Sequence, residues 1–383
     1  MNGKERNAGG TRLRKRERRA HIRKRKIRLA VALAAVILLA FVLVISAVHQ
    51  ALVKAPEITP PVIDSGRTDD RVTAEDVDVP SDRKEDFYTF LVVGRDTGGG
   101  GNTDTILLAA YDIPNQKLNV MSIPRDTMVN VPWDIKKINS VYNNNGGGEE
   151  GIQALCTQVG QLVGFMPDFE VVVEWDAVGE LVDVIGGVWF DVPRNMSYDD
   201  PAQNLHIHFN KGYQYLNGED AMKVIRWRKN NGNSGYDTGD IGRIETQQAF
   251  LKVVAAQCLQ IQNASKIQEF AQIFAENVQT DLTAGNLAWF AERAIFDGLT
   301  MDDVSFVILP GNYYAEAWSR TYQNKQSYVL PYTEELLAMV NESFNPYLED
   351  RVAEQLDIMS VNEDGSVSSS TGIVKDSGAA KPQ

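Results

Sequence analysis

Residues Phe90 to Asp126 read FLVVGRDTGGGGNTDTILLAAYDIPNQKLNVMSIPRD, and this stretch sets the centre of the predicted fold. It contains three apolar runs bounded by Gly, Pro, Asn and Asp, a pattern typical of buried strands: Phe90–Val93, Ile106–Tyr111 and Leu118–Ile123. The turn residues Asp112–Asn115 separate the second run from the third. We therefore expect these two strands to form a hairpin.

The connections between the three strands predict where their polar ends lie. If the strands share a sheet, the first ends where the glycine-rich loop begins, the second starts where that loop ends, and the third returns to the same edge. Asp96, Asp104, Arg125 and Asp126 would then converge at one end of the sheet. Carboxylates and an arginine beside a glycine-rich loop favour a metal-assisted phosphate site. The alternative is a solvated turn flanked by surface charges.

The charge distribution indicates a membrane protein with most of its mass on one side. Residues 1–28 hold 13 Lys and Arg against 2 Glu, which gives them a net charge of +11. The whole chain has a net charge of −13, so residues 29–383 carry −13 − 11 = −24. Leu29–Val48 follows with no charged residue, long enough to span a hydrocarbon core of roughly 30 Å. Because the basic head should stay in the cytoplasm, we expect residues 49–383 to be extracytoplasmic. A cleaved signal peptide or a nucleic-acid-binding head are the alternatives, but the run is long and the membrane already explains the basic charge.

Beyond the membrane segment we expect three regions. Residues 49–85 are rich in Pro, Asp, Thr and Arg and predict a stalk, residues 86–350 a folded body, and residues 351–383 a disordered tail. In the body, helical and strand patterns alternate, which favours an α/β fold. Residues 206–216 predict a short hairpin around Asn210-Lys211-Gly212. Cys156 and Cys258 lie in predicted amphipathic helices, where buried free thiols are expected, although an extracytoplasmic body permits a disulfide.

A second group of charged residues follows a predicted helix over residues 218–225. Arg226 and Arg228 point the same way only if that helix has stopped before them, as the loop 229–236 suggests. Asp240 and Arg243 share a face of the first turn of the next helix, whose N-terminus favours anions. Phosphoryl transfer uses this inventory of carboxylates and guanidiniums. The alternative for Arg226 and Arg228 is a solvated basic face.

Several motifs in order resemble the LytR-CpsA-Psr family. The motifs are NTDTILLAAYD, SIPRDT, KINSVY, VVVEWDAVGELVDVIGGVWFDVP, GYQYLNGEDAMKVIRWR and GDIGRIETQQ. The resemblance covers about residues 90–257, behind the same single-anchor topology. It implies an α/β/α sandwich with a mixed central sheet, an apolar groove for a lipid, and one transmembrane helix before the body.

The resemblance also implies the activity and the site. The family transfers glycopolymers such as wall teichoic acid or capsule from a polyprenyl pyrophosphate carrier to peptidoglycan, at the bacterial cell membrane. By position, Asp96 and Asp104 match magnesium ligands. The arginines that match the pyrophosphate clamp are Arg125, Arg226, Arg228 and Arg243. Asp240 matches a carboxylate near the attacked phosphate; Asp104 or Asp126 could instead orient the acceptor hydroxyl.

Two departures from the family pattern concern charge. The family usually has an arginine shortly after the first aspartate, whereas here Arg95 precedes Asp96 and glycines follow it. Thr246 stands where an arginine is common. The competing functions are a membrane-bound regulator, a non-catalytic binder of lipid-linked polymer, or a pyrophosphate hydrolase. Because the basic head has no apolar pattern from which to fold a DNA reader, we expect no nucleic-acid partner.

Overall fold

The structure is a computed structural model that describes residues 53–58, 82–95, 103–201, 204–232, 234–238, 240–260, 265–267, 269, 271–272 and 278–376. The chain divides into two compact units, Met1–Lys54 and Ala55–Gln383, and the architecture below is that of the second. Within the described ranges no helix is both long and apolar enough to cross a membrane. The predicted membrane segment, Leu29–Val48, lies outside those ranges.

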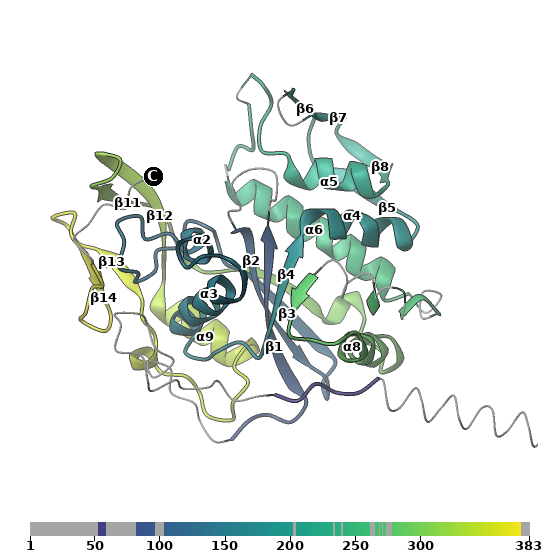
Figure 1. The fold of residues 1–383 in the computed structure, drawn as a ribbon, viewed down its shortest axis with the longest axis horizontal. Helices are drawn as coiled ribbons and strands as arrows, with labels where there is room; N and C mark the ends of the chain where they lie inside the picture. Colours follow the sequence, from purple (N-terminus) through teal and green to yellow (C-terminus); the bar gives the residue numbers. More distant parts are fainter. Residues whose placement is uncertain are drawn as a thin grey trace, which may run out of the picture. The chain divides into compact units, whose positions relative to one another are not determined.

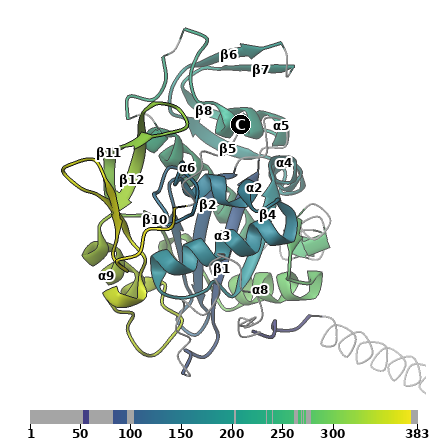
Figure 2. The same cartoon turned by 60° about the vertical axis from the view of Figure 1, so that its left-hand side comes forward.

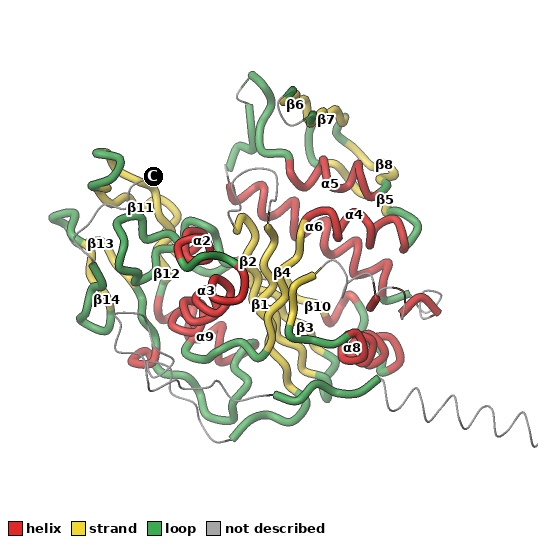
Figure 3. The backbone as a smooth tube through the Cα atoms, in the orientation of Figure 1, coloured by secondary structure: helices red, strands yellow, loops and turns green. Residues whose placement is uncertain are grey.

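A six-stranded mixed sheet forms the centre of the second unit, in the strand order β10-β3-β2-β1-β4-β9 (Figure 3). Its strands are β1 (Phe87–Arg95), β2 (Thr103–Asp112), β3 (Lys117–Ser122), β4 (Phe169–Glu174), β9 (Val278–Thr280) and β10 (Val304–Ile308). The predicted hairpin is confirmed, because β2 and β3 pair antiparallel from Leu107–Ser122 to Asp112–Lys117. β4 pairs parallel with β1 and antiparallel with β9, and β10 pairs parallel with β3, which makes the sheet mixed.

Alternation along the strands places the buried side chains on two opposite faces of the sheet. Leu91 and Val93 of β1 belong to the larger core, under the helices α3 (Gly148–Val163) and α9 (Thr333–Ser343). Phe90 and Val92 face the opposite side, where α6 (Asp240–Cys258) and α8 (Ala284–Phe296) lie. Helices therefore cover both faces of the sheet, as Figure 1 shows. The expected α/β/α layering fits this arrangement.

A second core lies beyond one end of the sheet. Its elements are α4 (Trp175–Val184), β5 (Val188–Val192), β6 (Met196–Asp200), β7 (Leu205–Phe209), β8 (Gly212–Leu216) and α5 (Gly218–Arg226). The side chain of Asn217 caps α5 by accepting a hydrogen bond from the amide of Asp220 at 2.9 Å. This bond satisfies one of the first amides of the helix.

The predicted hairpin over residues 206–216 is wrong. β7 and β8 do flank Asn210 and Lys211, but β7 pairs with β6, and β8 pairs with β5. The alternate residues of β5 are buried in the second core, and Leu216 of β8 is buried directly opposite Val188. Burial of this apolar face, rather than the short turn, decides which strands pair.

The predicted disordered tail is wrong for residues 351–376. After β11 (Gly311–Ser319) and β12 (Asn324–Pro331) the chain forms a small hairpin of β13 (Met359–Val361) and β14 (Val367–Ser369), labelled in Figure 1. Leu356 and Ile358 are buried in the larger core. The side chains of Asn130, Lys136 and Arg320 bind residues 373–376 by hydrogen bonds. The sequence does not indicate this packing, because the few apolar residues of 351–376 are scattered among polar ones.

The predicted boundary between stalk and body at residue 86 falls too late. Arg83 forms an ion pair with Asp168 at 2.8 Å and a bridge to Tyr347, and Ile58 packs against the core beneath α8. Both cysteines are free thiols, as expected; Cys156 is buried and Cys258 is partly exposed. Short helical turns at Ile138–Ser140, Val141–Asn144, Met301–Asp303 and Ala353–Gln355 complete the unit.

Candidate functional site

One end of the central sheet gathers the polar ends of β1, β2 and β3. Gly94 pairs with Thr105 and Arg95 with Thr103 across an irregularity in the register, so the end of β1 lies beside the start of β2. The amide of Ile123 donates to the carbonyl of Ile106 at 2.8 Å and brings the end of β3 to the same edge. Asp104 belongs to β2 at this edge. Asp96 lies outside the residues that the structure describes, and only the backbone of Asp104 is described.

Arg125 is attached to this edge through its backbone. Its carbonyl accepts from the amide of Asn139 at 3.2 Å, and the carbonyl of Asn139 accepts from the hydroxyl of Thr103 at 3.2 Å. Two hydrogen bonds thus connect Arg125 to the residue next to Asp104. The neighbouring Asp126 is engaged by Lys137, whose Nζ lies 2.9 Å from its Oδ1. This ion pair gives Asp126 a structural partner.

The helix α6 connects this edge to the second core. Gln247 accepts from the hydroxyl of Thr105 at 3.5 Å and donates to the carbonyl of Ile225 at 3.4 Å. Arg243 lies four residues before Gln247 and therefore shares its helical face, and it is only 5% exposed. The nearly buried Arg243 thus belongs to the helical face on which Gln247 contacts both the start of β2 and the end of α5. Asp240 begins α6, but its side chain is not described.

The sequence Arg226-Trp227-Arg228 leaves the helical conformation where the loop signal suggested. α5 ends at Arg226, and Trp227 is extended with φ −64° and ψ 134°. Trp227 is buried in the second core and its indole donates to Asn230 at 3.2 Å. Arg226 is half-buried and Arg228 is exposed. The buried Trp227 therefore stands between a half-buried arginine at the end of the helix and an exposed arginine after it.

These hydrogen bonds link the backbone around Asp104 to that of Arg125, and through Gln247 of α6 to Ile225, the residue before Arg226. The roles given to these residues by resemblance stay predictions. An apolar surface continues along the sheet face beneath α6, where the following side chains are only partly buried: Phe90, Val92, Leu118, Leu251 and Phe306.

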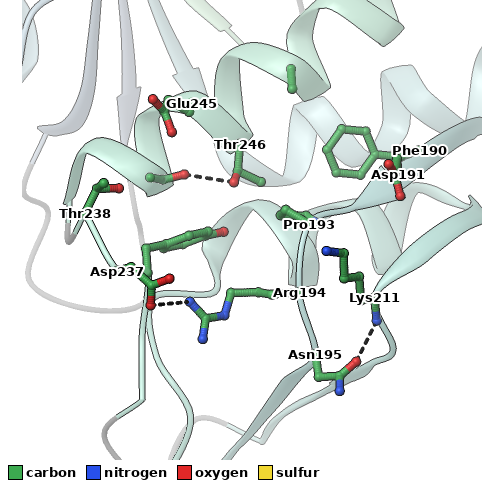
Figure 4. A pocket seen from close by; sticks show the side chains of 13 residues that line it. Phe190, Asp191, Pro193, Arg194, Asn195, Lys211, Asp237, Thr238, Glu245 and Thr246 are labelled. Atoms are coloured by element: carbon green, nitrogen blue, oxygen red, sulfur yellow. Dashed lines mark hydrogen bonds and ion pairs between the residues drawn. The ribbon is translucent and has the colours of Figure 1, made fainter.

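A cavity of about 590 Å³ lies on another face of α6 (Figure 4). Arg194 lines it with its guanidinium over two rings, 5.4 Å from the centre of Trp227 and 5.7 Å from that of Tyr236. Thr246 lines it too, and its hydroxyl donates to the carbonyl of Gly242 at 2.9 Å. Burial raises the pKa of the Tyr236 phenol. Arg194 is not predicted from the sequence, because a lone arginine after a strand belongs to no motif.

A sequence profile described as the LytR_cpsA_psr family matches residues 57–345. The chain belongs to the LytR-CpsA-Psr family. This membership confirms the resemblance inferred from the motifs. The match begins within the predicted stalk and ends shortly after α9.

Two individual proteins that are similar to this chain have different functional names. The polyisoprenyl-teichoic acid–peptidoglycan teichoic acid transferase TagV of Bacillus subtilis (strain 168) is 28% identical over 242 residues, 60% of this chain and 58% of TagV. The regulatory protein MsrR of Staphylococcus aureus (strain COL) is 27% identical over 199 residues, 51% of this chain and 56% of MsrR. The chain thus spans less than three fifths of either relative.

Solved structures agree on the fold. The crystal structure of B. subtilis TagV superposes with a TM-score of 0.52 at 25% identity, covering 66% of this chain and 94% of that one. A transcriptional regulator from Enterococcus faecalis gives a TM-score of 0.55 at 18% identity, covering 70% and 91%. The mixed α/β architecture is therefore shared with LytR-CpsA-Psr proteins.

Proposed function

We propose that this LytR-CpsA-Psr protein transfers a glycopolymer from a polyprenyl pyrophosphate carrier to peptidoglycan by metal-assisted phosphoryl transfer. The observation that carries the proposal is the set of hydrogen bonds that links the start of β2, which contains Asp104, to the backbone of Arg125 and, through Gln247 of α6, to the end of α5. Family membership and the transferase activity named for the relative TagV support it. Wall teichoic acid and capsule are the polymer classes we consider.

Arginines are suited to hold the pyrophosphate. A guanidinium binds phosphate oxygens in a bidentate manner and keeps its charge at every physiological pH. The low exposure of Arg243 removes water from around its charge, which strengthens its interaction with an anion. Arg125 and Arg226 would approach the same anion from the sheet edge and from the end of α5.

The residues present fit a magnesium site. Asp96 and Asp104 flank the loop between β1 and β2, and the pairing of Gly94 with Thr105 places the two flanking segments side by side. Carboxylate oxygens are the ligands that Mg²⁺ prefers, and the bound ion supplies charge neutralisation to phosphate oxygens. Asp96 and Asp104 would hold it, with the arginines completing the charge.

The proposed reaction is a displacement at a phosphorus atom of the pyrophosphate. A sugar hydroxyl of peptidoglycan attacks the glycan-linked phosphorus, and Asp240 accepts the proton of that hydroxyl. The bond from this phosphorus to the bridging oxygen breaks, and polyprenyl phosphate leaves with the bonding pair. The partly buried apolar side chains beneath α6 would hold the polyprenyl chain, and the cavity beside Thr246 would receive sugar units.

The proposed location is the bacterial cell membrane. Leu29–Val48 would form a single anchor, with the basic residues 1–28 in the cytoplasm and the catalytic body outside. Such a tether keeps the site near the leaflet that contains the lipid carrier. Peptidoglycan and the lipid-linked glycan are the partners that this location supplies.

Reconstituted transfer tests the proposal. The full chain in detergent is incubated with Mg²⁺, a labelled polyprenyl-pyrophosphate glycan and peptidoglycan, and label in peptidoglycan is measured. Arg125→Ala should lower the rate about 100- to 1000-fold, as loss of a preorganised charge partner does. Arg293→Ala, which removes an exposed arginine of α8 paired with Asp297, should leave it unchanged. Equal rates for both variants would overturn the assignment, and label released without peptidoglycan would indicate a hydrolase.

A regulatory role is the second candidate, favoured by the name of the relative MsrR. It would act through the basic residues 1–26, whereas a transferase needs them only for membrane insertion. Replacing residues 1–26 with an unrelated basic sequence separates the two. A transferase keeps its transfer rate, and a regulator loses its effect on gene expression.

A further inference from the structure

The β6–β7 ribbon carries a group of metal-ligating side chains away from the site described above. Asp199 of β6 lies directly opposite His206 of β7, and His208 follows two residues later on the same face. The Oδ1 atom of Asp199 lies 2.6 Å from Nδ1 of His206 and 3.1 Å from Nε2 of His208. All three ligand atoms lie within 4.8 Å of one another. Figure 2 shows the ribbon apart from the central sheet.

Hydrogen bonds from the next loop fix the backbone that carries the carboxylate. The amide of Asp199 donates to the side chain of Asn231 at 2.7 Å, and the same side chain donates to the carbonyl of Asp199 at 2.9 Å. The amide of Ser197 donates to Asn230 at 2.6 Å. The ligands therefore project from a paired, anchored ribbon, which holds a small constellation better than a loose loop does.

We propose that Asp199, His206 and His208 bind a divalent transition cation of the zinc class. Two imidazole nitrogens and one carboxylate oxygen are a ligand set that suits Zn²⁺, whereas Mg²⁺ prefers oxygen alone. Each side chain is about half exposed, at 43% for Asp199, 54% for His206 and 56% for His208. A cation can thus enter from solvent and complete its shell with water.

The alternative is a ribbon held by hydrogen bonds alone, in which Asp199 accepts from both imidazoles. The two arrangements differ in their response to metal. Metal binding uses the lone pair of one nitrogen on each imidazole, so added Zn²⁺ would take the place of the hydrogen bonds to the carboxylate. A ribbon held by hydrogen bonds alone would take up no zinc.

Zinc titration of the full chain tests the proposal. The protein is produced without a polyhistidine tag and held in detergent with excess Mg²⁺, so that sites made of oxygen ligands are occupied. Calorimetry with Zn²⁺ and the visible absorption of Co²⁺ report binding. We expect one equivalent of zinc near neutral pH and a cobalt spectrum typical of mixed nitrogen and oxygen ligands. His206→Gln and His208→Gln should each weaken binding by roughly tenfold or more.

The remaining two histidines of the chain, His21 and His49, provide matched controls. His21→Gln and His49→Gln should leave zinc binding unchanged. The unfolding temperature of every variant without zinc should match that of the wild type, which shows that folding is not the cause. No zinc uptake by the wild type, or unchanged binding after both His206→Gln and His208→Gln, would overturn the proposal.

Discussion

At the scale of single residues, exposure separates arginines that share a charge. Arg243, in the first turn of α6, is 5% exposed, whereas Arg228, which follows Trp227, is exposed to solvent. A charge surrounded by protein interacts with an anion through a lower effective dielectric and is little screened by salt. The family commonly has a further arginine at the position of Thr246, which here is buried and lines the cavity together with Arg194.

Substituting the two arginines should therefore have unequal effects. We expect Arg243→Ala to lower transfer about 100- to 1000-fold at any salt concentration. Arg228→Ala should cost less, and its effect should shrink as salt rises, because exposed charges are screened within about 10 Å at 0.1 M salt. Transfer rates at low and high salt measure both. Equal and salt-independent losses would contradict the difference in exposure.

At the scale of elements, the contact between β4 and α3 contains a buried carboxyl group. Glu170 of β4 is 9% exposed and accepts from Gln153 of α3 at 3.0 Å. Burial, followed by the nearby charges of Asp281 and Glu149, raises the pKa of Glu170 from 4.5 to about 7. The folded protein thus holds this proton more tightly than the unfolded chain. The stability that Glu170 contributes is fully present below about pH 4.5 and is lost as the pH rises to about 7.

Replacing Glu170 by glutamine should remove this dependence. Glu170→Gln keeps the shape without a charge, so it should raise the unfolding temperature at about pH 8 and change it little at about pH 5. Thermal unfolding followed by circular dichroism at both pH values measures the effect. Glu363→Gln, at an exposed position, is the control and should change neither. A lower unfolding temperature for Glu170→Gln at about pH 8 would refute the assignment.

At the scale of the whole molecule, residues 351–376 belong to the folded body. Leu356 is 1% exposed and packs in the core shared with α3 and α9. Residues 373–376 accept and donate hydrogen bonds with Asn130 and Lys136 near the other side of that core. Burial lowers the pKa of Lys136 to about 8. Residues 356–376 therefore pack against the buried Lys136 as well as against apolar side chains.

Leu356→Ala should be strongly destabilising for this reason. Truncating a buried leucine leaves a cavity and costs about 2–5 kcal/mol. Leu348→Ala removes the same atoms from a side chain that is 66% exposed, and should change stability by less than about 0.5 kcal/mol. Urea unfolding of both variants gives the two free energies. If both variants lose the same free energy of unfolding, residues 351–376 do not contribute to the core, and the prediction of an unstructured tail would stand.

The sequence by itself determined the elements whose signals are local. The β2–β3 hairpin, α3, α5 with its Asn217 cap, and the end of α5 before Trp227 follow from turn residues, apolar periodicity and capping. The motif order also predicted the family, and the strand order predicted that Asp104 and Arg125 share one edge. These inferences succeed because each depends on residues that are neighbours in the chain, or on one short connection.

Only the tertiary structure decided the features that depend on distant partners. β8 pairs with β5 rather than with β7, residues 351–376 pack against the core, and Arg194 stacks on Trp227 and Tyr236. The face of each element that is buried, and the partner that buries it, result from the free energy of the whole core. That quantity is a sum over contacts between segments far apart in sequence, so no local pattern contains it.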